Sequence, residues 1–148
     1  MSGFYVMIWD ITQSRAREIE LRSQVTQDAM TGLLNRAAFM DILNDEIKHH
    51  YLKRQALALL FLDIDHFKQV NDTLGHAAGD ELIKIFARRL RQNVRGTDHV
   101  ARLGGDEFVV LLVGLDAERT ATAVVDKLMA AVCRDAELAA SHTASPPA

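Results

Sequence analysis

The chain contains a single cysteine, Cys133, in its 148 residues. No intrachain disulfide can form, which fits a reducing compartment. No apolar run approaches the roughly 20 residues of a membrane-spanning helix, and the N-terminus lacks the basic and apolar regions of a signal peptide. Positive side chains do not outnumber negative ones, and the formal net charge is −3. We therefore expect a cytoplasmic chain with no membrane segment and no nucleic-acid polymer as partner.

Proline is scarce as well, and both prolines lie near the C-terminal end, at positions 146 and 147. From residue 139 the chain is small and polar, without a core-forming pattern. Residues 139–148 are therefore predicted to form a disordered tail. The remaining composition, with 49% hydrophobic and 25% charged residues, is typical of one globular domain with additional segments.

Hydrophobic periodicity predicts the elements of that domain. Spacings of three and four residues predict helices beginning near Asn35, Asp80 and Asp116, whereas short apolar runs predict strands. The predicted strands are residues 4–9, 56–62, 99–103 and 107–113, and a charged linker helix is predicted over 13–27. Residues 66–79 contain Asn71-Asp72 and two glycines, so they are predicted to be irregular.

The most informative stretch is Gly104-Gly105-Asp106-Glu107-Phe108, which lies between two apolar runs that predict a β-hairpin. Two glycines at the tip permit positive φ and leave open space above the backbone. The adjacent carboxylates repel one another unless a cation lies beside them. The pattern suits a metal-dependent phosphate site, although a solvated acidic turn has the same local signature.

The order of the elements brings a further carboxylate to this tip. A right-handed strand–helix–strand crossover makes strand 56–62 parallel to strand 99–103. If strand 107–113 inserts between them, the result is an α+β fold with a split βαβ sheet of ferredoxin-like type. Asp63 is then expected beside Asp106 and Glu107. Mg²⁺ binds through a few carboxylates and completes its shell with water and phosphate oxygens, so these residues predict a magnesium site.

Other polar residues follow strand 56–62. Residues 75–80 precede a helix whose free N–H groups favour anions, and Lys68 can offer a positive charge to phosphate. Asn71 and Asp80 can read a base edge, because an amide both donates and accepts hydrogen bonds and a carboxylate accepts them. Ordinary capping and turn formation also explain these residues, and His76 taken alone is more often structural.

Four motifs in fixed order carry a family resemblance. They are Asp28-Ala-Met-Thr-Gly-Leu-Leu-Asn-Arg36, Asp63-Ile-Asp-His-Phe-Lys68, Asn71-Asp-Thr-Leu-Gly-His76 followed by Gly79-Asp80, and Arg102-Leu-Gly-Gly-Asp-Glu-Phe108. Residues 28–135 closely resemble the first two-thirds of a GGDEF domain, the catalytic module of diguanylate cyclases, and we assign a partial domain to 28–138. The resemblance implies an incomplete nucleotidyl-cyclase-type sheet covered by helices.

The resemblance also implies a reaction, in which two GTP molecules condense across a homodimer into cyclic di-GMP with release of pyrophosphate. It implies that Asp106 and Glu107 are catalytic, with Asp106 accepting the proton. The implied ligands of Mg²⁺ or Mn²⁺ are Asp63, the backbone carbonyl of Ile64, Asp106 and Glu107. The implied substrate-binding residues are Phe67, Lys68, Asn71, His76, Asp80, Gly104 and Gly105, with Asn71 and Asp80 on guanine.

Arg95-Gly-Thr-Asp98 ends shortly before the hairpin tip. This spacing is similar to the family's product-inhibition site, an Arg-x-x-Asp motif that binds cyclic di-GMP. An arginine fork suits guanine or phosphate. A surface arginine and a turn aspartate also explain the motif.

The two ends of the chain depart from the family pattern. Residues 1–12 resemble the last strand of a PAS-like sensor domain, followed by a signalling helix over 13–27. The family pattern continues with further strands and a helix that have no counterpart after Leu138. We therefore expect strand 56–62 to have an unpaired edge, with impaired stability and activity. The alternatives are an inactive module that binds GTP or cyclic di-GMP, and a non-functional fragment.

Overall fold

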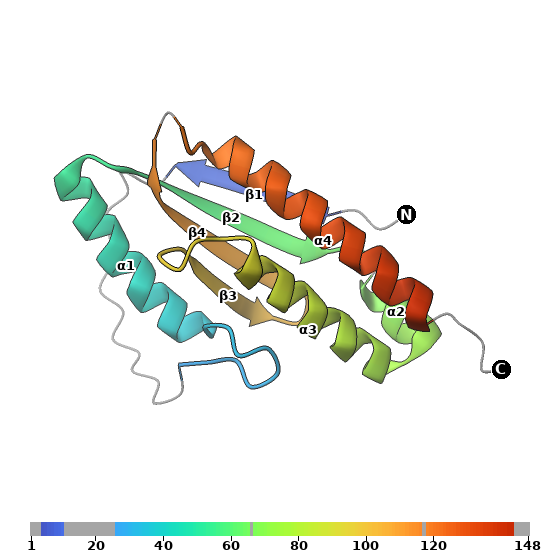
Figure 1. Cartoon of the computed structure of the whole chain (residues 1–148). Helices are drawn as coiled ribbons and strands as arrows, with labels where there is room; N and C mark the ends of the chain where they lie inside the picture. The colour runs from blue at the N-terminus through green and yellow to red at the C-terminus, as the bar shows by residue number, and fades with distance from the viewer. Residues whose placement is uncertain (1–3, 11–25, 66, 117, 144–148) are drawn as a thin grey trace.

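The structure is a computed structural model that describes residues 4–10, 26–65, 67–116 and 118–143. These residues form a mixed α+β fold with helices on both faces of a four-stranded sheet (Figure 1). The strands are β1 (Phe4–Asp10), β2 (Ala56–Ile64), β3 (His99–Gly104) and β4 (Glu107–Leu115). The helices are α1 (Arg36–Lys53), α2 (Phe67–Leu74), α3 (His76–Gln92) and α4 (Ala121–Thr143).

The sheet has the order β1-β2-β4-β3, and each neighbouring pair is antiparallel. Strand β4 therefore lies between β2 and β3, which run parallel to one another. This is the split βαβ arrangement that the sequence predicts. In β2 and β4 consecutive residues are buried, as expected for central strands covered on both faces.

Two separate hydrophobic clusters fill the two faces of the sheet. The larger one joins the sheet to α3 and α4, and the rings of Phe86 and Phe108 pack there at 45° with centroids 4.8 Å apart. The smaller one joins the sheet to α1 through Phe39 and Ile47. Helix α1 begins where predicted, because the Asn35 side chain accepts a hydrogen bond from the Ala38 amide at 2.9 Å.

The prediction of an irregular segment over 66–79 is wrong. Residues 67–74 form α2, and α3 begins at His76, four residues before its predicted start at Asp80. Gly75, with φ of 92°, separates the two helices. Phe67, Val70 and Leu74 follow helical spacing, but the turn-forming residues around Asn71 obscured that pattern.

The expectation that the outer edge of β2 is unpaired is also wrong. Strand β1, which the sequence predicts as a strand, pairs with β2 along its length from Phe4–Ile64 to Asp10–Ala58. The pairing satisfies backbone groups that an edge strand leaves open. The assignment of residues 1–12 to a sensor-like remnant stays a prediction, but the structure places 4–10 in the same sheet as β2.

The structure differs from the sequence prediction at two further boundaries. Helix α4 continues to Thr143, so residues 139–143 are helical where a disordered tail is predicted. Ala139 and Ala140 have high helix propensity and favour continuation of the helix into this segment. The linker helix predicted over 13–27 lies outside the described residues apart from its last two, and there Gln27 forms a β-bridge with Leu34. In the part of the chain that is described, no helix has the length and apolarity to span a bilayer.

Candidate active site

The β3–β4 hairpin presents the two glycines of the signature at its tip. Gly104 and Gly105 have φ values of 151° and 51°. A Cβ at either position would meet no atom within 4 Å, so the backbone conformation and not close packing requires glycine. The guanidinium of Arg102 donates from Nε to the Gly105 carbonyl at 2.9 Å, which fixes the turn. Arg102 therefore holds the backbone of the turn, and the space above the two glycines is open.

Asp63 and Asp106 meet beside this tip, with Glu107 and Asp65 close enough to act on the charge of Asp63. Asp63 lies opposite Glu107 in the register of β2 and β4, and the Ile64 amide donates to the Asp106 carbonyl at 3.3 Å. A hydrogen bond to the Asp106 side chain raises the pKa of Asp63 to about 6. Burial and the charges of Asp106, Glu107 and Asp65 act in the same direction. A cation beside the pair would offset the repulsion that raises this pKa.

The arrangement fits a hard divalent cation that is shared with a ligand. Among the described side chains, no three His, Cys, Asp or Glu residues group as a preformed metal cage. Mg²⁺ is usually held by one or two carboxylates together with substrate phosphates, and the Asp63–Asp106 pair offers that donor set. Asp63, the Ile64 carbonyl, Asp106 and Glu107 as ligands all stay predictions, as does Mg²⁺ or Mn²⁺ as the ion.

The predicted guanine-binding residue Asn71 lies against α3. Gly79 is buried, and a Cβ there would lie 1.8 Å from Asn71 Oδ1 and 3.3 Å from the Phe67 ring. Asn71 Oδ1 is buried and has no hydrogen-bond partner among the described residues. Since such an acceptor is costly to bury, the site fits a ligand that donates an N–H group. Asp80 follows Gly79 directly and is exposed.

The remaining predicted substrate residues lie at the start of α2 and α3. Phe67 is half-buried and packs against the larger hydrophobic cluster, whereas Lys68 beside it is exposed. His76 is the first residue of α3 and is exposed. Helix α3 starts at His76, so its free N–H groups lie four residues earlier in the chain than predicted.

Asp28 and Arg102 form a contact to which the sequence reasoning assigned no role. Arg102 lies 3.3 Å from the Asp28 carboxylate, which also accepts hydrogen bonds from the Thr31 amide and hydroxyl at 3.0 and 2.8 Å. Burial acts to raise the pKa of Asp28, but the bonds from Thr31 and the charge of Arg102 outweigh it and lower the pKa. Arg102 thus ties the entry turn to the hairpin tip. The Asp-x-x-Thr spacing, typical of a side-chain-stabilised turn, is the signal that could have revealed it.

The two residues of the Arg-x-x-Asp motif have different environments. Arg95 is exposed and lines a cavity of about 500 Å³ together with Arg119 and Lys127. The Asp98 side chain is fully buried and pairs with Arg119. It also accepts hydrogen bonds from the Arg95 and Val113 amides at 2.8 and 3.1 Å. Arg95 is therefore open to a ligand, whereas Asp98 supports the fold.

The fold and the acidic tip define an α+β domain with a split βαβ sheet and a carboxylate pair where the central strands β2 and β4 meet the hairpin tip. The family described as "Diguanylate cyclase, GGDEF domain" matches residues 25–144. The chain belongs to the GGDEF family.

Two curated relatives illustrate the similarity. The chain is 42% identical over 125 residues to the diguanylate cyclase TpbB of Pseudomonas aeruginosa, which is 84% of this chain and 29% of TpbB. It is 47% identical over 91 residues to the cyclic di-GMP phosphodiesterase NbdA of the same species, which is 62% of this chain and 12% of NbdA. The chain thus spans less than a third of either relative.

Solved structures agree with this family. An isolated GGDEF domain of TpbB from P. aeruginosa matches with a TM-score of 0.68 and 45% identity, covering 71% of this chain and 61% of that one. The GGDEF domain of DgcB from Caulobacter crescentus, in complex with c-di-GMP, matches with a TM-score of 0.66 and 34% identity, covering 74% and 63%.

Proposed function

We propose that this chain condenses two molecules of GTP into cyclic di-GMP with release of two pyrophosphates. The observation that carries the proposal is the Asp63–Asp106 carboxylate pair beside an open, glycine-lined hairpin tip. The membership of the family and relatives named diguanylate cyclase support it. A solvated acidic turn would not require two carboxylates from distant parts of the chain to share a hydrogen bond.

Different residues bind the base, the phosphates and the metal ion. Asn71 and Asp80 hold the guanine edge, and Lys68 with the first turn of α3 attracts the phosphates. Asp63, the Ile64 carbonyl, Asp106 and Glu107 would hold Mg²⁺ or Mn²⁺, which when bound offsets the charge of the reacting phosphate. Asp106 accepts the proton of the 3′-hydroxyl as it attacks the α-phosphate. Gly104 and Gly105 allow the nucleotide to approach the backbone.

The reaction requires two copies of the chain. Each copy presents one nucleotide, and each 3′-hydroxyl attacks the α-phosphate held by the other copy. We therefore propose a homodimer as the active form, in the cytoplasm. Positioning of the two nucleotides then supplies much of the rate enhancement, because it converts an encounter in solution into a reaction within one complex.

A second proposed property is inhibition by the product at the cavity beside Arg95. The cationic side chains of Arg95, Arg119 and Lys127 line this cavity, and its volume of about 500 Å³ suits a small ligand. Arginine forks bind guanine edges and phosphates. We propose that Arg95 contacts cyclic di-GMP directly, whereas Asp98 acts by holding Arg119 in place.

The test is an assay of the purified chain with GTP and Mg²⁺ that follows pyrophosphate and cyclic di-GMP together. We expect both products from the wild type and neither from Asp106→Asn. GTP binding without either product would instead support the alternative, a binding module. The impaired activity expected from the sequence stays a prediction. Measuring the turnover of this chain beside that of the isolated GGDEF domain of TpbB would test it.

A further inference from the structure

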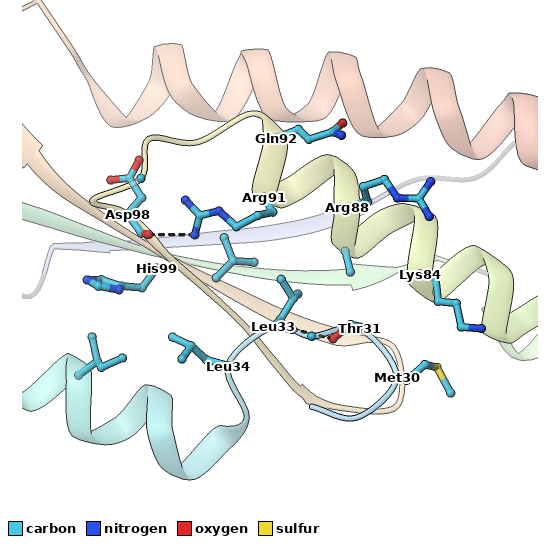
Figure 2. Close-up of a pocket in the computed structure, with 15 residues that line it drawn as sticks. Met30, Thr31, Leu33, Leu34, Lys84, Arg88, Arg91, Gln92, Asp98 and His99 are labelled. Carbon is cyan, nitrogen blue, oxygen red and sulfur yellow. Dashed lines mark hydrogen bonds between the residues drawn. The ribbon is translucent and has the colours of Figure 1, made fainter. Parts of the chain in front are cut away.

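A larger cavity lies between α3, the loop 30–34 and the start of β3, on the opposite side of α3 from its contacts with α4 (Figure 2). Its volume is about 670 Å³, within the usual range of small-molecule sites. Of the residues to which the sequence assigned a role, only Asp98 lines it. The cavity is therefore separate from the proposed catalytic residues, and it borders the Arg95–Asp98 turn.

The polar wall of this cavity is cationic. Lys84, Arg88 and Arg91 line it in a row along α3, where spacings of four and three residues place side chains on one face (Figure 2). The single acidic residue in the lining is Asp98, and its carboxylate is already paired with Arg119. The chain as a whole has a net charge of −3, so this row is a local concentration of positive charge.

The three cations differ in how firmly they are held. Arg91 donates to the backbone carbonyls of Asp98 and Arg95 at 3.1 and 2.5 Å, which fixes its guanidinium. Lys84 makes an exposed contact of 3.4 Å to Glu81, and such pairs are weak. Arg88 is exposed and has no hydrogen-bond or ion-pair partner in the described part of the chain. Arg88 and Lys84 are thus available to an anion, and Arg91 is pre-positioned behind them.

The floor of the cavity is apolar, and one end is polar. Leu33, Ala87 and Val100 form buried parts of the floor, with exposed fractions of 6%, 1% and 2%. At the polar end, His99 Nε2 faces Glu46 Oε1 of α1 at 3.4 Å, and Glu46 itself does not line the cavity. A ligand with an apolar ring matches this floor.

We propose that this cavity binds a phosphorylated small molecule with an aromatic ring, of the size of a nucleoside monophosphate. The phosphate contacts Arg88 and Lys84, and the ring lies on the floor formed by Leu33 and Val100. Charge-assisted hydrogen bonds to phosphate orient the ligand.

The test uses the full chain labelled with ¹⁵N, titrated separately with AMP, adenosine and inorganic phosphate, and followed by amide chemical shifts. AMP is the probe because it lacks the guanine edge that Asn71 and Asp80 would read. We expect saturable shifts from AMP in residues 84–92, 30–34 and 99. Adenosine and phosphate are each expected to bind at least about tenfold more weakly, because each lacks half of the contacts.

Arg88→Gln is the diagnostic variant, and Arg89→Gln is the matched control on the same helix outside the cavity. We expect Arg88→Gln to weaken AMP binding about tenfold, as the loss of one charge-assisted hydrogen bond does. Arg89→Gln, with the same change of net charge, should leave it unchanged. Equal weakening by both variants, AMP shifts confined to other residues, or no saturable shift at millimolar AMP would overturn the proposal.

Discussion

Replacing Asp98 by alanine should destabilise the fold severely, even though its position in an Arg-x-x-Asp motif suggests a ligand. The carboxylate is fully buried and receives four hydrogen bonds. Two come from the backbone amides of Arg95 and Val113, and two from the guanidinium of Arg119. The Asp98→Ala change leaves these donors without their acceptor.

The magnitude follows from what remains buried. The Arg119 side chain is only 10% exposed, so removing its partner leaves a poorly solvated charge. Breaking a buried ion pair in this way costs about 3–5 kcal/mol. The buried Val113 amide adds to this cost, but the losses are not additive because Arg119 keeps its bond of 2.7 Å to the Val113 carbonyl. We expect a total of about 4 kcal/mol, a large part of the stability of a domain this small.

Urea unfolding followed by far-ultraviolet circular dichroism measures this cost. The matched control is Arg95→Ala, because that side chain is exposed and its backbone amide is retained. The control should lie within about 0.5 kcal/mol of the wild type. In a double-mutant cycle, Asp98→Ala combined with Arg119→Met should cost at least about 2 kcal/mol less than the sum of the single changes.

The opposite pattern would show that Asp98 does not support the fold. If Asp98→Ala unfolds within about 1 kcal/mol of the wild type while cyclic di-GMP binding is lost, the residue acts as a ligand and not as a support. A coupling energy near zero with Arg119 would contradict the buried pair itself.

Three further predictions concern the acidic tip and its surroundings. Gly79→Ala forces Asn71 to move, since its Oδ1 lies 1.8 Å from the added Cβ, and steady-state kinetics should show a KM for GTP raised about tenfold with an unchanged fold. Arg102→Lys keeps the charge but loses the planar fork that reaches both the Asp28 carboxylate and the tip, so stability should fall by about 1–2 kcal/mol in urea unfolding and turnover should fall with it. Asp63→Asn should change the pH dependence of stability in metal-free buffer. The folded pKa of about 6 exceeds the ordinary 3.8, so the wild type gains stability below pH 3.8 and loses it as the pH rises through 6. Thermal unfolding at pH 8 should therefore show the variant to be more stable, by about 1 kcal/mol after solvent screening; equal stability of the two at pH 8 would argue against the raised pKa of Asp63.

The sequence predicts the part of the fold in which local pattern and topology agree. The hairpin has two glycines at its tip and an apolar run on either side, so its strands and their place in the sheet follow from local rules. Asn35 likewise predicts the start of α1. Once the order of β2, β4 and β3 is known, the meeting of Asp63 with Asp106 follows from the sheet alone.

Other features depend on contacts between distant residues. Nothing in the sequence of β2 shows that β1 is its neighbour in the sheet, because the pattern of one strand does not specify which strand pairs with it. The burial of Asp98 depends on Arg119, 21 residues further along the chain. The sequence does not predict helix α2 for a local reason, since Asn71-Asp72 and Gly75 suggest a turn. The tight contact of Gly79 with Asn71 forms only when α2 and α3 pack together.

The most direct test of the central claim is the binding site of Mn²⁺, located by paramagnetic broadening of amide signals in the ¹⁵N-labelled chain above pH 6. We expect selective broadening at residues 63–65 and 104–107, because Asp63 and Asp106 would hold the ion. Asp106→Asn should abolish this broadening, whereas Asp72→Asn, which removes one exposed carboxylate on α2, should preserve it. Broadening that persists in Asp106→Asn, or that occurs only elsewhere in the chain, would contradict the account.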